Sequence, residues 1–247
     1  MPHLEGSVEG KAADDDRMPE ASPDGRAGSS APSREAGGDT QMRIAIFGAT
    51  GGTGIELVGQ ALERGHAVTA FVRDPASLAR GGDGLTVVTG DVHDVAAVAR
   101  CVRGQDAVVC ALGSRELKKT MIRVIGTVSI IDGMKQEGVS RLIVVSAMGI
   151  GASWNDLSLV NRLFFATLLR GARADHETQE AAVMASGLDW TIVRPSALVD
   201  TPGTGGYGVG ERVRATTSKI PRADVANAIL NELADGLLVG KAVTITN

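Results

Sequence analysis

The chain has 247 residues, 43% of them apolar, and a formal net charge of −4. This length predicts one domain or two small ones. The acidic excess lies in residues 1–41, which hold nine acids and four bases, whereas residues 42–247 hold 20 acids and 21 bases. The folded part therefore gives no electrostatic reason to expect a nucleic-acid partner. No apolar run reaches the ~20 residues of a membrane helix.

Residues 1–41 differ in composition from the rest of the chain. They are rich in Gly, Ala, Ser, Pro and Asp. Such a segment cannot bury enough apolar surface to offset its ordering entropy, so we expect a disordered tail. It lacks the apolar centre of a signal peptide, and it is too acidic for a transit peptide. Met42 stands directly before the first expected strand, so the tail is either an extension upstream of a natural start there or a regulatory segment.

From residue 42 onward, short apolar runs alternate with helical patterns. The expected strands are 43–47, 67–72, 85–88, 107–112, 141–147, 189–195 and 242–246, and the expected helices are 53–64, 95–102, about 120–137, 156–170, 174–186 and 221–233. Strands that are apolar throughout and followed by helices are typical of a parallel sheet covered on both faces. We therefore predict one doubly wound α/β Rossmann domain over residues 42–247. Its ligand crevice would lie at the carboxyl ends of the strands, beside a small C-terminal substrate-side portion.

The segment GATGGTG (48–54) lies between the first expected strand and the first expected helix. Its glycines at 48, 51 and 54 let the backbone adopt positive φ and approach a diphosphate. The helix that begins near Thr53 would direct free N–H groups and the positive end of its dipole at the anion. The segment thus predicts a dinucleotide diphosphate site, and the alternative is a merely tight turn.

The end of the second expected strand indicates which dinucleotide binds. An enzyme that uses NAD has an acid there to accept from the ribose hydroxyls. This chain has Val72-Arg73, with Asp74 one residue later. Because a guanidinium would pair with a 2′-phosphate, the sequence favours NADPH over NADH. The alternatives are that Asp74 turns in, or that Arg73 is a solvated surface residue.

Further motifs follow in order: VRDP (72–75), GDV (90–92), DAVVCALGSR (106–115), GVSRLIVVSAMG (138–149), SGLDWTIVRPSAL (186–198) and KIPRADVANAIL (219–230). Together with the glycine turn, they resemble the atypical short-chain dehydrogenase/reductases that have an NAD(P)H-binding Rossmann domain. Within that family the chain is most similar to the biliverdin-IXβ reductase/flavin reductase type and its bacterial relatives.

The resemblance implies a set of cofactor-binding residues. Gly48, Thr50, Gly51, Gly52 and Thr53 would line the phosphates, Arg73 would meet the 2′-phosphate, Asp91 and Val92 would border the adenine, Ala111, Leu112 and Gly113 would lie under the nicotinamide ribose, Ser146, Ala147 and Met148 would lie beside the nicotinamide, and Pro195 would cover its far side. Asp91 could instead be a loop acid that caps a helix. Leu112 and Met148 also suit core packing.

One departure from typical short-chain dehydrogenases concerns the proton source. Those enzymes carry a Tyr-x-x-x-Lys pair downstream of a serine that Ser146 would match. Here the only tyrosine is Tyr207, and no such pair follows Ser146. Reduction of an isolated ketone leaves a localised alkoxide that needs an aligned acid. A flavin, a quinone or a linear tetrapyrrole spreads that charge over its rings and can take its proton from solvent.

Two side chains are candidates for a catalytic role. Ser146 could hydrogen-bond a substrate oxygen or cap the end of its strand. His176 matches a histidine of the related reductases, and the pKa range of histidine suits proton transfer. A structural or solvated histidine at a helix start is the alternative. The pattern of histidines and cysteines predicts no metal site.

Aromatic residues indicate where a planar substrate would bind. Trp154 and Phe165 lie in the segment 150–170, and Tyr207 lies in the glycine-rich segment 200–210, which suggests a mobile flap or a hairpin with Tyr207 at its tip. Helical spacing also makes core packing an alternative for the aromatic residues of the first segment.

We therefore predict an NADPH-dependent reductase of a planar conjugated small molecule such as a flavin, a quinone or a polyketide quinone. A non-catalytic NADP(H)-binding redox sensor is the alternative, and a sugar-nucleotide epimerase is disfavoured by the absent tyrosine–lysine pair. Cys101 and Cys110, which lack metal-ligand partners nearby, predict reduced core cysteines and a cytoplasmic protein. We expect no membrane or nucleic-acid partner, and either a monomer or a homodimer.

Overall fold

The structure is a computed structural model, and it describes residues 41–78, 81–113, 121–150, 170–213 and 217–247. These residues lie in a single compact unit. The expected tail and nearly all of the expected helix 156–170 lie outside the described residues. Among the helices that are described, none is long and apolar enough to cross a bilayer.

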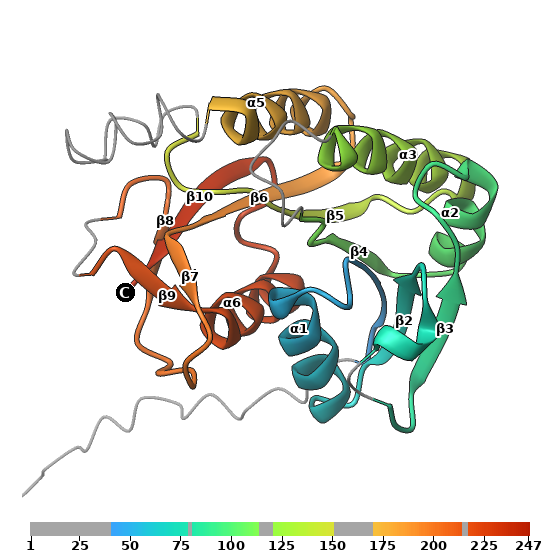
Figure 1. Cartoon of the computed structure of the whole chain (residues 1–247), viewed down its shortest axis with the longest axis horizontal. Coiled ribbons are helices and arrows are strands. Elements are labelled where there is room, and N and C mark those ends of the chain that lie inside the picture. Colours follow the sequence, from blue (N-terminus) through green and yellow to red (C-terminus); the bar gives the residue numbers. More distant parts are fainter. Residues whose placement is uncertain (1–40, 79–80, 114–120, 151–169, 214–216) are drawn as a thin grey trace, which may run out of the picture. The chain divides into compact units, whose positions relative to one another are not determined.

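An eight-stranded sheet forms the centre of the fold (Figure 1). Its strands, in spatial order, are β3 (Leu85–Thr89), β2 (Ala67–Val72), β1 (Arg43–Phe47), β4 (Ala107–Cys110), β5 (Arg141–Val145), β6 (Asp189–Pro195), β10 (Lys241–Thr246) and β8 (Gly208–Gly210). All neighbouring strands are parallel except β10 and β8. The predicted doubly wound α/β fold is therefore confirmed.

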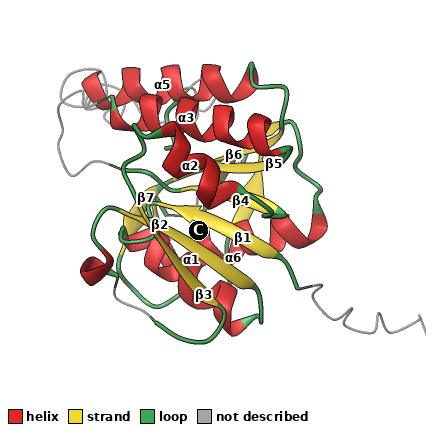
Figure 2. Cartoon of the chain, turned by 90° about the vertical axis from the view of Figure 1, so that its right-hand side faces the viewer, coloured by secondary structure: helices red, strands yellow, loops and turns green. Residues whose placement is uncertain are grey.

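Helices cover both faces of the sheet (Figure 2). The helices α1 (Gly52–Glu63) and α6 (Arg222–Asp235) lie on one face, and α2 (Val95–Val102), α3 (Ile122–Glu137) and α5 (Arg170–Met184) lie on the other. In β1, Ile44 and Ile46 pack toward α1 and α6, whereas Ala45 and Phe47 pack in the cluster with α2 and α3. Burial on both faces explains why this strand is apolar without alternation.

The helix ends follow local sequence signals. The carboxylate of Asp94 caps α2 by accepting from the backbone N–H groups of Ala96 and Ala97, as the sequence predicts. The helices α3 and α6 end at Gly138 and Gly236, whose φ angles of 71° and 64° are left-handed. Expected and observed boundaries therefore differ by only a few residues.

Three short strands are not predicted by the sequence. β7 (Ala197–Val199) pairs with β9 (Lys219–Pro221) in a separate two-stranded sheet, and β8 lies antiparallel to β10. Each has three residues, which is too short to show a period-2 pattern. The glycine-rich segment 200–210 thus ends in a strand of the main sheet.

The strand order reverses direction between β1 and β4, which makes their carboxyl ends the switch point of the sheet. Ligands of open α/β sheets bind at such a point. The glycine turn follows β1, and Ala111 follows β4. The fold therefore brings the predicted phosphate site to the expected crevice.

Candidate dinucleotide site and its surroundings

The glycine turn requires glycine at two of its positions. Gly48 ends β1 with a φ of 85°, and a Cβ there would collide with the carbonyl group of Ala111. A Cβ on Gly54 would collide with the carbonyl oxygen of Gly48 and with Ala49. The backbone N–H of Gly51 donates to the Gly48 carbonyl oxygen at 3.0 Å and closes the turn. These close contacts exclude side chains at both positions, so the backbone of the turn stays accessible to a diphosphate.

The N-terminus of α1 has free donors for an anion. Its N-cap, Gly51, makes no side-chain capping bond, and the first turn holds no acid. The first N–H groups of a helix have no partner within the helix and carry the positive end of its dipole. Gly51 and Gly52 are exposed, whereas Thr53 is buried and Thr50 half-buried. The predicted phosphate-lining residues thus form one loop-to-helix junction that fits a dinucleotide diphosphate.

The segment after β4 lies beside this junction. The backbone N–H of Ala111 donates to the Phe47 carbonyl oxygen at 2.9 Å, which extends the pairing of β1 and β4 by one residue. Leu112 is half-buried and packs against the cluster under α2 and α3, so the core-packing alternative holds for this side chain. Gly113 is exposed. This segment therefore lies beside the glycine turn, and its contact with the nicotinamide ribose stays a prediction.

Arg73 and Asp91 are the residues predicted for the adenosine end of the site. Arg73 is exposed at the end of β2. The pKa of Asp91 is lowered chiefly by hydrogen bonds from the backbone N–H and ring of His93, and to a smaller extent by the charge of Arg73. The Asp91 carboxylate lies 2.9 Å from the His93 nitrogen and 2.5 Å from Nδ1. Asp94 caps α2, so Asp91 is not a helix cap. Val92 is buried beside it.

The predicted nicotinamide residues come together at the ends of β5 and β6. The backbone N–H of Ser146 donates to the Val193 carbonyl oxygen at 2.8 Å, and that of Met148 donates to the Pro195 carbonyl oxygen at 2.9 Å. Ser146 and Pro195 are buried, and Met148 and Ala147 are half-buried. The segments that follow β5 and β6 therefore remain hydrogen-bonded to each other beyond the ends of these strands.

The two predicted catalytic side chains, Ser146 and His176, meet beside these paired segments. The hydroxyl oxygen of Ser146 lies 3.3 Å from Nδ1 of His176 on α5. Burial and, to a smaller extent, the charge of Arg123 lower the pKa of His176 to about 4, against the opposing effects of Asp175 and Gln179. The imidazole is therefore neutral at pH 7, and in the tautomer that leaves Nδ1 unprotonated this atom accepts a hydrogen bond from the serine hydroxyl.

A buried set of hydrogen-bonded side chains, formed by Gln179, Thr127 and Cys110, was not predicted from the sequence. The Gln179 side chain donates to the Thr127 hydroxyl at 2.9 Å, and the Cys110 thiol lies 3.5 Å from the same hydroxyl. Burial raises the pKa of Cys110, so it stays a thiol, as expected for a core cysteine. These groups fix α5 against α3 and β4. The only sequence signal for these contacts is Thr127 itself, a polar residue in a largely apolar helix.

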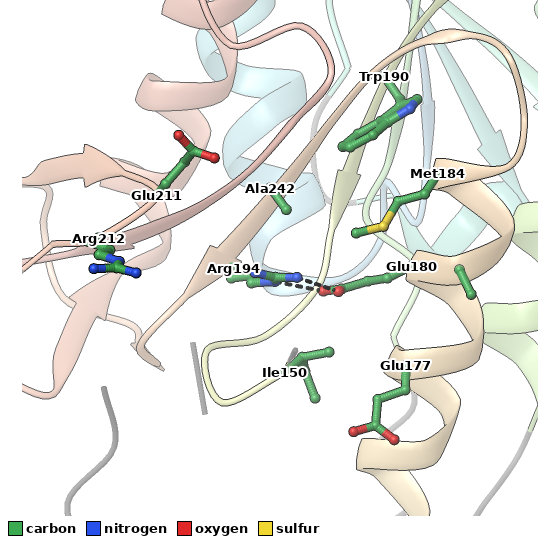
Figure 3. A pocket seen from close by; sticks show the side chains of 10 residues that line it. Ile150, Glu177, Glu180, Met184, Trp190, Arg194, Glu211, Arg212 and Ala242 are labelled. Carbon is green, nitrogen blue, oxygen red and sulfur yellow. Dashed lines mark hydrogen bonds and ion pairs between the residues drawn. The ribbon is translucent and has the colours of Figure 1, made fainter. Parts of the chain in front are cut away.

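A second feature that the sequence analysis missed is a cavity of about 860 Å³ between α5, β6 and β10 (Figure 3). Arg194 of β6 and Glu180 of α5 face each other across it, with Nε–Oε1 and Nη2–Oε2 distances of 3.0 and 2.7 Å. Their side chains are only 6% and 5% exposed. Trp190 and Met184 form the apolar end. Among the described residues that line this cavity there is no predicted site residue, although Glu177 and Arg194 directly adjoin His176 and Pro195 in the sequence.

The predicted substrate residues are only partly described. Trp154 and Phe165 lie outside the described residues. Tyr207 is half-buried, and its hydroxyl donates to Asn227 of α6 at 2.6 Å and accepts from Asn231 at 3.3 Å. Asp224 accepts hydrogen bonds from the backbone N–H groups of Thr204 and Gly205, which ties this segment to α6. The segment of the expected mobile flap or hairpin thus contacts α6 through Tyr207 and through Thr204 and Gly205, and a substrate contact of Tyr207 stays a prediction.

The described residues contain no group of three or more His, Cys, Asp or Glu side chains that could hold a metal ion. The described part of the predicted site comprises the glycine turn, the Ser146–His176 pair beyond β5 and Arg73 at the end of β2.

Comparison with known proteins agrees with this geometry. Residues 48–236 match the model of a protein family described as NAD(P)H-binding. The Bacillus subtilis protein YwnB is 30% identical over 203 residues, which cover 78% of this chain and 92% of YwnB. An Arabidopsis thaliana chloroplast protein is 33% identical over 177 residues, but this match spans 66% of the chain and only 61% of the plant protein. The solved structure of ChuY, an anaerobilin reductase from Escherichia coli O157:H7, aligns with a TM-score of 0.69 and 25% identity over 83% of this chain and 96% of ChuY.

Proposed function

Because the chain belongs to the NAD(P)H-binding family of Rossmann-fold oxidoreductases, we propose that it transfers hydride from NADPH to a planar conjugated acceptor. The acceptor class comprises flavins, quinones and related polycyclic aromatic compounds. The reaction proceeds without a proton relay from a tyrosine. A redox sensor that binds NADP(H) without turnover is the competing function.

The observation that carries this proposal is the pair Ser146–His176 at the nicotinamide end. A serine hydroxyl and a neutral imidazole are poor acids at pH 7, since the pKa of His176 is held at about 4. The hydroxyl of Tyr207, the only tyrosine of the chain, contacts Asn227 and Asn231. An acceptor that delocalises the incoming charge does not need a strong side-chain acid.

The residues of the chain would bind and orient both molecules. The glycine turn and the N-terminus of α1 hold the diphosphate, and Arg73 holds the 2′-phosphate of the adenosine end. Ser146 and Pro195 orient the nicotinamide at the paired ends of β5 and β6. NADPH supplies the hydride when bound, and solvent supplies the proton. Position and electrostatics are then the contribution of the protein to the rate.

The similarity to ChuY supports the reaction type, since that protein is an anaerobilin reductase. Its sequence identity of 25% and its nearly complete alignment make it a relative of the whole domain. The proposed class of acceptor instead rests on the Ser146–His176 pair of this chain, which contains no strong acid.

The test is NADPH oxidation followed at 340 nm with FMN, menadione and a polycyclic quinone, and with NADH in parallel. We expect turnover with at least one acceptor, and faster turnover with NADPH. Gly54→Ala should abolish the activity, because a Cβ there collides with the carbonyl oxygen of Gly48 and displaces the backbone of the glycine turn. Tight NADPH binding without turnover on any acceptor would favour the sensor function instead.

A further inference from the structure

Arg222 lies directly against the glycine turn, although 170 residues separate it from Gly52. It is the first residue of α6, and Gly52 is the first residue of α1. The Cδ and Nε atoms of Arg222 lie 2.6 Å from the point that a Cβ on Gly52 would occupy. The arginine side chain thus fills the space beside the phosphate loop that a side chain at position 52 would otherwise take.

Several contacts fix Arg222 in this place. Its Nη1 donates to Oδ1 of Asp200 at 2.6 Å. The Gln60 side chain of α1 donates to the Ala223 carbonyl oxygen at 2.9 Å, and Arg64 donates to Asn231 at 2.9 Å. α1 and α6 therefore lie side by side along the same face of the sheet (Figures 1 and 2). The packing of α1 against α6 therefore determines where the Arg222 guanidinium lies.

The charges at this point favour an anion. The N-terminus of α1 has no side-chain cap and no acid in its first turn. Among the described residues, Nη1 is the one donor atom of the Arg222 guanidinium that has a partner. Nε and Nη2 remain as donors on a group that is 25% exposed, whereas Asp200 is 82% exposed and can stay hydrated. A guanidinium in this setting suits two phosphate oxygens.

We propose that Arg222, at the N-terminus of α6, binds the diphosphate of the dinucleotide beside Gly52 of the glycine turn. This inference rests on the proposed binding of NADPH. NADPH and NADH share the diphosphate, so Arg222 contributes to the affinity for both. Arg73 instead contributes to the affinity for NADPH alone, because only NADPH carries the 2′-phosphate.

The test is calorimetric titration of the full chain with NADPH, NADH and 2′-AMP, which has the 2′-phosphate but no diphosphate. For Arg222→Gln we expect binding of both dinucleotides to weaken about 10- to 100-fold, with 2′-AMP unchanged. Arg73→Ser should give the complementary result, with weaker NADPH and 2′-AMP and unchanged NADH. Arg64→Gln is the matched control, since Arg64 contacts α6 through Asn231, and it should leave all three affinities unchanged.

Gly52→Ala tests the same contact with every charge retained. Its added Cβ would displace the Arg222 side chain, and the flexible end of an arginine can move at small cost. We expect both dinucleotides to bind several-fold more weakly in this variant. In the Arg222→Gln background the same substitution should have no further effect, because the group that it displaces is gone.

The outcomes separate this inference from the proposed function. A wild-type chain that binds neither dinucleotide would overturn the proposed function. A wild-type chain that binds NADPH, with Arg222→Gln and Gly52→Ala both at wild-type affinity, would overturn only the role of Arg222. A loss of 2′-AMP affinity equal to that of NADPH in both variants would also overturn it, since that pattern belongs to a disordered site.

Discussion

The Ser146 hydroxyl oxygen lies 3.3 Å from Nδ1 of His176, which joins the end of β5 to the side of α5. The serine is buried at the strand end, and burial together with the charge of Arg123 keeps the histidine neutral at pH 7. A neutral imidazole that accepts from a hydroxyl orients that hydroxyl more than it acidifies it. We therefore expect the pair to position a substrate or the nicotinamide rather than to supply a proton.

The first prediction concerns Ser146→Ala and His176→Gln. With a quinone acceptor we expect kcat to fall by at most about tenfold in either variant, because the loss of a true general acid costs roughly 10²–10⁴-fold. Steady-state assays at saturating NADPH measure this effect. Ser140→Ala, at an exposed position, serves as the control. A loss beyond 100-fold in both variants would show that a proton relay operates after all.

The second prediction is a loss of stability in acid that depends on His176. Its pKa in the fold is about 4 and its ordinary value is 6.5, so below pH 6.5 the unfolded chain takes up a proton that the folded chain excludes. The free energy of unfolding should therefore fall between pH 6.5 and about 4, by up to roughly 3 kcal/mol from this group. Urea titrations across this range measure it. His176→Gln should have a shallower slope, and an identical slope in both proteins would refute the assignment.

The third prediction concerns the choice of cofactor. Arg73→Ser removes the guanidinium at the end of β2, so kcat/KM for NADPH should fall about 10- to 100-fold while that for NADH stays within twofold. Arg100→Ser, another exposed arginine, is the control and should change neither value. If the NADPH preference survives in Arg73→Ser, the 2′-phosphate is held by another group.

The sequence predicts those features whose signals are local. The glycine turn, the apolar strands and the Asp94 cap each depend on residues within one short segment, and the structure has all three. The contacts of Arg222 with Gly52 and of Arg194 with Glu180 join separate elements. The spacing of residues along the sequence does not indicate such pairs. Only a charge inside an apolar strand, as at Arg194 in DWTIVRP, hints that a partner is needed.

The same difference between local and long-range signals explains why the contacts of the segment around Tyr207 were not predicted. A run of glycines predicts backbone freedom, but Asp224 satisfies the N–H groups of Thr204 and Gly205, and Asn227 accepts from the tyrosine hydroxyl. These partners belong to a helix that begins after the glycine-rich segment. Their contribution becomes visible only when α6 is placed on the sheet.

The last prediction concerns the buried ion pair of Arg194 and Glu180. Glu180→Gln removes one charge and leaves the other in a site where the side chains are only 5–6% exposed, so the free energy of unfolding should fall by about 3–5 kcal/mol. The double variant Glu180→Gln/Arg194→Met removes both charges and should recover most of that loss, because no buried charge is left without a partner. Glu177→Gln, on the same helix but exposed, is the matched control and should change stability by less than about 1 kcal/mol. Urea unfolding of the four proteins measures these differences. Equal stability of the single and double variants would mean that water in the cavity already compensates Arg194 when Glu180 is neutral.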